Sequence, residues 1–405
     1  MERDYPKLTV TAKAERAIRA GHPWVYGEEV TAVEGSYQNG DIADVLNSWG
    51  KWLGAGFVND CSKIRVRLIS RNTNDRFDEG FFRRRVSYAL NYRKTVMGQD
   101  FSSCRLIHGE ADQFPGLTVD RYGDILVTQT LSLGMEKRKD AIFPLLVQVL
   151  REDGQKISGI FERNDVALRA HEGLEENKGW YVLPGESAPE SVITEICENG
   201  VRYKVDVENG QKTGFFLDQR DNRALVGHYA TGRNVLNLFC YTGGFSVYAL
   251  ASGARHVDSV DSSAKAMAMV DRNVALNGFA EGLHTSYTAD AIEFLGKCEE
   301  GKYDMMIVDP PAFAKHRGAL KNALRAYQRL NAAAIAKVAP GGLVFTFSCS
   351  QVVDKITFAN TVFSAAAQTG RSVRILDRLC QGADHPVSIY HPEGEYLKGL
   401  LLYVE

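Results

Sequence analysis

The pattern of hydrophobic and polar positions divides this chain of 405 residues into three zones. Up to about residue 72 the hydrophobic runs are short and glycines separate them, which is typical of strands joined by tight turns. We predict one short helix at Glu15–Ala20 and strands at Lys7–Val10, Ile42–Leu46, Trp52–Phe57 and Ile64–Ile69. This zone is predicted to form a small β-barrel.

The second zone, from about residue 77 to 190, mixes the two periodicities. We predict helices at Phe81–Thr95 and Lys137–Leu150. Strands are predicted at Leu117–Val119, Ile125–Thr130, Gly159–Glu162 and Trp180–Leu183. The pattern indicates an α+β domain.

In the third zone, from about residue 191 onward, short buried strands alternate with amphipathic helices. We predict strands at Val235–Phe239, His256–Val260, His284–Thr288, Met305–Val308 and Leu343–Phe347. Helices are predicted at Phe245–Ala251, Ser263–Asn277, Ala291–Leu295 and Leu320–Val338. This alternation indicates an α/β fold, a Rossmann-like doubly wound parallel sheet with helices on both faces. Such a sheet binds ligands beyond the carboxyl ends of its strands.

Length and composition bound the organisation of the chain. Since 405 residues exceed what one hydrophobic core fills, we predict three domains at 1–75, 76–190 and 191–405. No uncharged apolar run reaches the roughly 20 residues that cross a bilayer, and no secretory segment is recognisable, so we predict a cytoplasmic protein without membrane contact. The seven cysteines are widely spaced, which predicts reduced thiols and no metal site.

The formal net charge of −2 hides a local excess of positive charge. Between Cys61 and Lys94 ten basic residues stand against three acidic ones. The ten are Lys63, Arg65, Arg67, Arg71, Arg76, Arg83, Arg84, Arg85, Arg93 and Lys94. They could form one basic face for nucleic-acid phosphates, and an ordinary solvated surface explains them equally well.

The turn after the first strand of the third zone predicts a nucleotide site. The run Asn237–Phe245 holds two adjacent glycines where a strand passes into a helix, so the backbone can approach a ligand closely. We predict cofactor contacts from Phe239, Tyr241, Thr242 and Gly243.

Two acidic residues strengthen this prediction. Asp261 ends the second strand, 17 residues beyond Gly244, where a carboxylate can accept hydrogen bonds from ribose hydroxyls. Asp290 ends the third strand, where it can contact an adenine edge, cap the helix that follows, or do both. The three-glycine pyrophosphate fingerprint is absent, which disfavours a nicotinamide dehydrogenase and predicts a nucleotide without a pyrophosphate.

The run Asp309-Pro310-Pro311-Ala312-Phe313 follows the fourth strand. Two prolines end the ladder and fix an extended turn, although one would suffice to stop a strand. We therefore predict that this turn holds Asp309 and the Pro310 carbonyl beside a bound base, with Phe313 as a further substrate contact.

Cys349 follows the fifth strand, at the same edge of the sheet. An isolated cysteine is usually a structural residue of the core. Carbon 5 of cytosine, however, becomes nucleophilic only after a thiolate adds to carbon 6, and this strategy needs an ionisable cysteine beside the base. We predict that Cys349 is that nucleophile and that Asp309 stabilises the ring at N3.

The segment Gln211–Arg220 interleaves polar residues with two phenylalanines, a composition that suits a lid over cofactor and substrate. We predict that Gln219 contacts the cofactor, and that Lys212 or Arg220 lies near a methionine carboxylate or an RNA phosphate. The alternative is an amphipathic segment that leads into a helix around Gln219–Gly227.

Nearly the whole chain resembles the bacterial class I RNA 5-methylcytosine methyltransferases that act on large-subunit ribosomal RNA. The resemblance is carried by the runs GHPWV (21–25), GEAD (109–112), FPGL (114–117), KTGFFLDQR (212–220), NLFCYTGGFS (237–246), DPPAF (309–313), FSCS (347–350), ADHP (383–386) and EYLKG (395–399). Unlike many RNA cytosine methyltransferases, the chain carries no second cysteine in its DPPAF loop to aid product release.

The resemblance implies an N-terminal PUA domain that presents RNA, a central α+β domain, and a catalytic domain that uses S-adenosylmethionine. It implies 23S ribosomal RNA as the substrate, a site that joins Cys349 with Asp309, and an RNA path over the basic stretch, where we place Arg83 and Arg84. A homodimer remains open.

Two other functions stay open at this point. A DPPAF-type turn also suits direct methyl transfer to an exocyclic amine such as guanine N2, and Cys349 favours the carbon-5 reaction over it. The chain could also be a non-catalytic RNA-binding or ribosome-assembly protein, against which Asp261, Asp309 and Cys349 argue.

Overall fold

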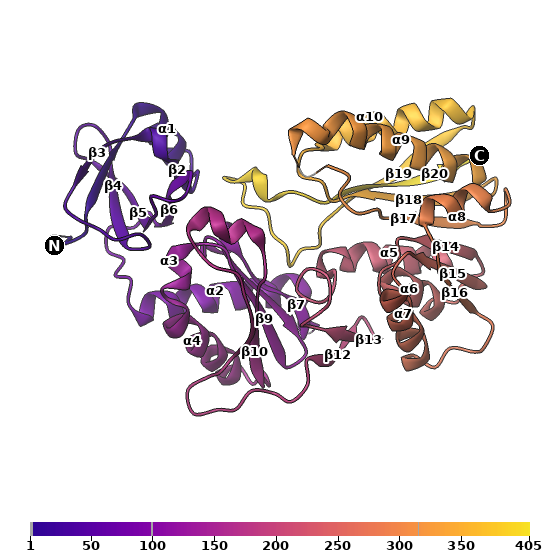
Figure 1. Cartoon of the computed structure of the whole chain (residues 1–405), viewed down its shortest axis with the longest axis horizontal. Helices are drawn as coiled ribbons and strands as arrows, with labels where there is room; N and C mark the ends of the chain where they lie inside the picture. The colour runs from indigo at the N-terminus through magenta and orange to yellow at the C-terminus, as the bar shows by residue number, and fades with distance from the viewer. Residues whose placement is uncertain (1–2, 99, 315) are drawn as a thin grey trace. The chain divides into compact units, whose positions relative to one another are not determined.

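The computed structural model describes residues 3–98, 100–314 and 316–405 (Figure 1). These residues form two compact units that do not follow the order of the sequence. The first contains the chain up to Ile196 together with Val205–Phe215 and Ala383–Gly394. The second contains Cys197–Lys204, Phe216–Gly382 and Glu395–Glu405. Two segments from the second half of the sequence therefore fold with the N-terminal half.

The N-terminal part of the first unit is a six-stranded sheet in the order β2-β6-β5-β4-β1-β3. Its elements are β1 (Lys7–Val10), α1 (Ala12–Arg19), β2 (Trp24–Tyr26), β3 (Val30–Glu34), β4 (Ile42–Leu46), β5 (Trp52–Val58) and β6 (Ile64–Ser70). The predicted helix begins three residues earlier than expected because the Thr11 side chain caps it at the amide of Ala14. The sequence pattern missed β2, which is short, and β3, which is mostly exposed.

The central part of the first unit is a five-stranded sheet in the order β11-β10-β9-β8-β7. Its elements are α2 (Glu79–Met97), β7 (Ser103–His108), β8 (Leu117–Tyr122), β9 (Ile125–Thr130), α3 (Leu133–Glu136), α4 (Lys139–Glu152), β10 (Gly159–Asn164) and β11 (Asn177–Tyr181). The strand predicted at Trp180–Leu183 begins and ends earlier. Phe57 of the barrel belongs to the same buried cluster as Leu146 of α4, which explains why barrel and central sheet form one unit.

A hairpin of β12 (Ile193–Glu198) and β13 (Val201–Asp206) follows the central sheet, and the sequence pattern did not predict it. Its two-residue loop is Asn199-Gly200, and both residues have positive φ, 50° and 82°. Asn-Gly at this position is a strong signal for a type I′ hairpin turn. The signal was therefore present in the sequence.

The second unit contains a seven-stranded sheet in the order β16-β15-β14-β17-β18-β20-β19. Its strands are β14 (Asn234–Leu238), β15 (His256–Asp261), β16 (His284–Thr288), β17 (Met305–Val308), β18 (Gly342–Ser348), β19 (Val373–Cys380) and β20 (Lys398–Val404). Its helices are α5 (Arg220–Ala230), α6 (Gly244–Ala251), α7 (Ala264–Leu276), α8 (Ala291–Lys297), α9 (Leu320–Lys337) and α10 (Lys355–Thr369). All five predicted strands are present.

The sheet is buried on both faces, as predicted. Met305 and Ile307 of β17 belong to one hydrophobic cluster, whereas Met306 and Val308 belong to another. Helices α9 and α10 lie together over one face (Figure 1). The sheet is not wholly parallel, however, because β20 runs antiparallel to both β18 and β19. The sequence pattern missed α10, β19 and β20.

The segment Ala383–Gly394 joins β19 to β20 in sequence but folds with the first unit. Its Asp384 carbonyl accepts a hydrogen bond from the fully buried guanidinium of Arg93, which also pairs with Asp112 at 2.6 Å. The Asp384 carboxylate accepts from the amide of Arg105 at 2.9 Å. Runs that are far apart in sequence, 109–112 and 383–386, therefore meet in one buried network. No helix among the described residues is long and apolar enough to span a membrane.

Candidate active site

The order of the sheet reverses between β14 and β17, which makes their carboxyl ends the expected ligand site. The predicted residues follow neighbouring strands there. Asp261 ends β15, Asp309 follows β17 and Cys349 follows β18. Since β14 pairs in parallel with both β15 and β17, and β17 with β18, all three side chains start from one edge of the sheet.

The loop after β14 is held in an uncommon backbone conformation. Phe239 and Tyr241 have φ values of 57° and 50°, and Gly243 has 80°. Left-handed backbone at residues other than glycine costs free energy and gathers at ligand sites. The Tyr241 amide donates to Asp261 Oδ2 at 3.0 Å, which fixes the loop to the end of β15.

The same loop fits a nucleoside-type cofactor. The Thr242 hydroxyl oxygen is buried and has no hydrogen-bond partner among the described residues. A Cβ atom at Gly243 would lie 3.0 Å from Val270, so this position favours glycine by space as well as by φ. Asn273 donates to the Thr242 carbonyl at 2.9 Å and supports the turn from beneath. A shaped turn with an unpaired hydroxyl suits a ligand that carries polar groups.

Asp290 caps α8, one of the two roles expected for it. Its side chain accepts hydrogen bonds from the amides of Ile292 and Glu293, each at 2.9 Å. Capping is therefore confirmed, and contact with an adenine edge stays a prediction. Asp261 also accepts from the Ser263 amide at 2.9 Å, and a carboxylate keeps further lone pairs for a ribose.

Gln219 contacts a catalytic candidate in this structure. Its Nε2 donates to Asp309 Oδ2 at 2.9 Å, and its Oε1 accepts from Asn222 at 2.6 Å. Gln219 is 2% exposed, so this chain of bonds is buried at one end and fixes the Asp309 carboxylate. The role predicted for Gln219, contact with the cofactor, stays a prediction.

The other residues of the predicted lid lie in different surroundings. Arg220 is 7% exposed and donates to the Asn199 side chain at 3.1 Å. Lys212 is exposed, has a φ of 53° and belongs to the first unit. Between them, the buried Thr213 hydroxyl lies 2.5 Å from Asp120 and 2.8 Å from Tyr122. The middle of the segment is thus anchored in a core, which corrects the prediction of a lid.

The loops after β17 and β18 are tied together around Cys349. The Ser350 hydroxyl donates to the Ala314 carbonyl at 2.6 Å. The Ser348 hydroxyl donates to Tyr327 at 2.9 Å, and the Phe313 ring lies 4.7 Å from the Tyr327 ring. The pKa of Tyr327 is raised, mainly by burial, and the charges of Cys349 and Asp309 contribute to the rise. The charges of both catalytic candidates, Cys349 and Asp309, therefore affect the pKa of the Tyr327 hydroxyl.

Pro310 and Cys349 differ in access. Pro310 is buried, which fits a rigid turn, and its carbonyl role stays a prediction. Cys349 is half-buried, and all seven cysteines of the chain are free thiols. A thiol that is neither sealed in the core nor fully exposed can reach a bound base.

Sequence reasoning missed Lys398, which begins β20 opposite Ser348. The residue is 5% exposed, and its Nζ donates to the carbonyls of Ser350 at 2.5 Å and Val353 at 2.6 Å. Burial lowers the pKa of Lys398 to about 8, and the nearby charge of Cys349 opposes that shift. The signal was a lysine at the head of the apolar run Gly399–Val404, where a charge is costly unless it is needed.

Most members of the basic stretch form ion pairs within the first unit. Six of its ten members pair with carboxylates. Arg83 pairs with Glu152, and Arg84 lies 3.1 Å from Asp75. This pairing accords with an ordinary solvated surface, while the basic face and RNA contact by Arg83 and Arg84 stay predictions.

Comparison with protein families identifies both ends of the chain. A family model described as a PUA-like domain matches residues 8–71, and one described as an S-adenosylmethionine-dependent methyltransferase matches residues 181–401. The chain is 41% identical over 392 residues to ribosomal RNA large subunit methyltransferase I of Aeromonas hydrophila, a match that covers 96% of each protein. It is 38% identical over 398 residues to the protein of that name from Klebsiella pneumoniae, covering 98% of this chain and 97% of the relative.

Solved structures agree with the fold. A proposed S-adenosylmethionine-dependent methyltransferase from Streptococcus mutans superposes with a TM-score of 0.80 at 23% identity, covering 98% of this chain and 100% of that one. Another solved chain, a proposed methyltransferase complexed with SAH, has a TM-score of 0.82 at 23% identity and the same coverage. The predicted fold, a PUA-like domain with a Rossmann-like methyltransferase sheet, is confirmed.

Proposed function

The chain belongs to the ribosomal RNA large subunit methyltransferase I family and is an S-adenosylmethionine-dependent methyltransferase, and on that premise we propose that it methylates carbon 5 of a cytosine in large-subunit ribosomal RNA. The observation that carries the proposal is the placement of Cys349 and Asp309 on adjacent parallel strands. Ribosomal RNA is the substrate that the relatives' names give, and a PUA-like domain accords with an RNA substrate.

The chemistry needs a thiolate and an acid. The Cys349 thiolate adds to carbon 6 of the base, which breaks the 5,6 double bond and makes carbon 5 nucleophilic. Protonated Asp309 donates to N3 and stabilises the charge that develops on the ring. When the carbon-5 proton has been removed by a base, the double bond re-forms and the sulfur leaves carbon 6. Gln219 orients Asp309 for its part in this sequence.

Lys398 is the residue that suits activation of the thiol. Its buried ammonium clamps the carbonyls of Ser350 and Val353, which fixes the loop that carries Cys349. A cation close to a thiol favours the thiolate, so Lys398 would lower the pKa of Cys349 relative to a neutral side chain at the same place.

The loop after β14 and the end of β15 would hold the cofactor. Bound S-adenosylmethionine supplies an electrophilic methyl group for carbon 5. Tyr241, Thr242 and Gly243 would form the turn that approaches it, and Asp261 would accept hydrogen bonds from its ribose. The buried Thr242 hydroxyl and the φ values of the loop support these roles. Contacts from Phe239 and Asp290 belong to the same proposal.

The test incubates the protein with labelled S-adenosylmethionine and unmodified large-subunit RNA, followed by nucleoside analysis. We expect 5-methylcytidine from the wild type, none from Cys349→Ala, and normal amounts from Cys197→Ala, which removes an exposed cysteine. RNA that contains 5-fluorocytosine should form a denaturation-resistant adduct with the wild type, because a fluorine on carbon 5 cannot leave as a proton does.

Three outcomes would overturn the proposal. A methylated purine, such as N2-methylguanosine, would establish transfer to an exocyclic amine. Full activity of Cys349→Ala would make this cysteine structural. A wild-type protein that binds the RNA and the cofactor but transfers no methyl group would instead be a non-catalytic assembly factor.

A further inference from the structure

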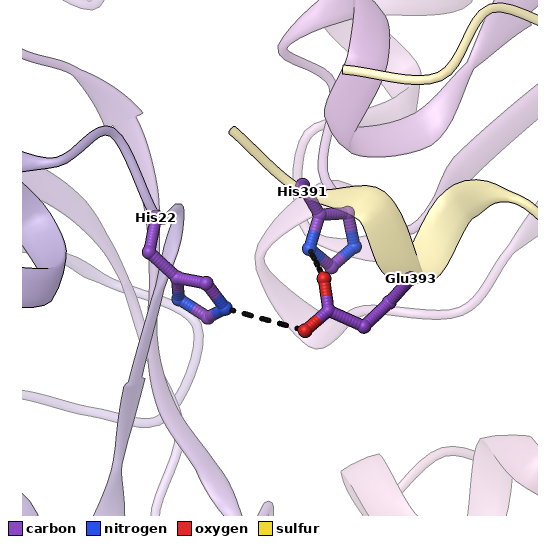
Figure 2. A group of neighbouring side chains, drawn as sticks. All are labelled: His22, His391 and Glu393. Carbon is purple, nitrogen blue, oxygen red and sulfur yellow. Dashed lines mark ion pairs between the residues drawn. The ribbon is translucent and has the colours of Figure 1, made fainter. Parts of the chain in front are cut away.

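Three side chains with metal-binding groups converge in the first unit. His22 precedes β2, whereas His391 and Glu393 belong to the segment Ala383–Gly394. One ligand atom from each lies within 4.8 Å of the other two. Figure 2 shows the Glu393 carboxylate between the two imidazoles. His22 Nε2 lies 3.8 Å from one carboxylate oxygen and His391 Nδ1 lies 2.9 Å from the other.

His391 supplies an independent observation that points to a ligand. The residue is 7% exposed, and its Nδ1 is a buried atom that makes no hydrogen bond to any described residue. Nδ1 approaches Glu393 closely, but without the direction of a hydrogen bond. A buried ring nitrogen in this state usually has an unseen partner, since leaving it unpaired costs free energy.

We propose that His22 Nε2, His391 Nδ1 and the Glu393 carboxylate bind a divalent transition-metal ion of the zinc class. Two imidazoles and one carboxylate are a ligand set that zinc accepts, with water in the fourth position. Ligand atoms about 2.0–2.1 Å from a tetrahedral zinc lie roughly 3.4 Å from one another. The separations of 2.9 and 3.8 Å fall on either side of that value. Small side-chain rotations would therefore complete the site.

The surroundings already position the ligands. His22 Nδ1 lies 3.3 Å from the Trp24 carbonyl and 3.3 Å from the Trp24 amide, so the backbone of Trp24 can pair with either tautomer of the ring. In the tautomer with its proton on Nδ1, the ring donates to the carbonyl and leaves the Nε2 lone pair for the metal. This arrangement is the usual second contact of a metal-binding histidine. The Trp24 ring lies 4.3 Å from the His391 ring and fixes its plane. Tyr390 packs against Gly21, where any Cβ would lie 2.4 Å from the tyrosine ring.

The bound cation would join Glu393 to both rings and fasten the segment Ala383–Gly394 to the turn before β2. This site is independent of the proposed methyl transfer, so each can fail without the other.

The experiment uses the full-length chain without a histidine tag, stripped of metal by a chelator. The protein is equilibrated with zinc chloride, dialysed against metal-free buffer, and analysed for zinc per chain. We expect one zinc per wild-type chain, and loss of that zinc in His391→Ala and in Glu393→Gln. His228→Ala, which removes an exposed histidine of α5, is the matched control and should keep it.

Cobalt(II) provides a second readout that does not depend on one variant. The cobalt-loaded protein should show ligand-field bands of a four-coordinate site without sulfur-to-metal charge transfer, because the ligands are nitrogen and oxygen. The proposal is overturned if the wild type retains no zinc after dialysis. It is equally overturned if folded His391→Ala and Glu393→Gln, checked by circular dichroism, both retain one zinc, or if the cobalt spectrum shows thiolate ligation.

Discussion

The structure holds positive charge in two different ways. In the basic stretch from Lys63 to Lys94, most guanidinium and ammonium groups meet a carboxylate of the same unit. At the carboxyl edge of the methyltransferase sheet, Lys398 is buried against two carbonyl oxygens. Six of the ten positive charges that suggest a binding face in the sequence are paired with carboxylates. The single charge of Lys398, in contrast, interacts electrostatically with Cys349. The partner of a charge, and not the local count, decides what the charge can do.

Arg223 and Glu198 form a buried ion pair, whose contribution to stability can be compared with that of an exposed pair. The Arg223 guanidinium donates two hydrogen bonds, each of 2.7 Å, to the Glu198 carboxylate, and the two side chains are 2% and 0% exposed. Because Glu198→Gln leaves a buried cation without its counter-ion, we expect a loss of about 3–5 kcal/mol in the free energy of unfolding, measured by urea denaturation. Glu152→Gln, which breaks the exposed pair with Arg83, is the control and should cost about 0–1 kcal/mol. Equal losses would remove the distinction between buried and exposed pairs.

Lys398→Met tests the role of a buried cation whose hydrogen-bond acceptors are carbonyl oxygens. Removing a buried cation beside Cys349 should raise the pKa of the thiol, so that the thiolate fraction near pH 7, and with it the alkylation rate, falls roughly ten-fold or more. The rate of Cys349 alkylation and the methylation rate should fall together. Since the lowered pKa of about 8 means that Lys398 loses its proton above that pH, the difference between variant and wild type should be large below pH 8 and shrink above it.

A purely structural role for Lys398 predicts a different result. The variant would then lose activity by the same factor at every pH, and its alkylation profile would overlay that of the wild type. Lys398→Arg provides a second variant that keeps the charge and should restore part of the alkylation rate near pH 7. Lys355→Met, which removes an exposed lysine near the same loop, is the control for a general change of surface charge.

Gln219→Ala tests the contribution of an uncharged hydrogen-bond donor to catalysis. The substitution removes the 2.9 Å hydrogen bond to Asp309. A hydrogen bond between neutral groups contributes about 0.5–1.5 kcal/mol, so we expect kcat/KM to fall roughly 2- to 10-fold. Gln148→Ala, on the exposed side of α4, should leave kcat/KM unchanged. If Gln219 contacts the cofactor instead, the loss will appear mainly in KM for S-adenosylmethionine.

Arg84→Ala has the smallest expected effect. Because Asp75 already neutralises Arg84, we expect a change in stability of about 0–1 kcal/mol. RNA affinity is measured over a series of salt concentrations, and the slope of its logarithm against the logarithm of salt concentration should stay unchanged. A slope that falls by a full unit would place Arg84 on an RNA phosphate and restore the basic face.

The sequence by itself determined five of the seven strands of the sheet and the edge at which the proposed site lies. Strands β17 and β18 are mostly apolar runs, β14 and β15 contain shorter apolar stretches, and a residue of the predicted site ends or follows each strand. Parallel pairing then brings Asp261, Asp309 and Cys349 to one edge by geometry alone. The capping role of Asp290 followed in the same way, because a cap involves only neighbouring residues.

Only the tertiary structure decided what each charge faces and where the late segments fold. Strand β19 is mostly exposed and carries no apolar periodicity, so its place beside β20 follows from the sheet and not from its sequence. The segment Ala383–Gly394 folds with the first unit because Arg93 and Arg105 bind Asp384, contacts that span almost three hundred positions. Pattern reasoning reads periods of two to four residues, whereas the partners of Lys398, His22 and Arg84 depend on distances through space.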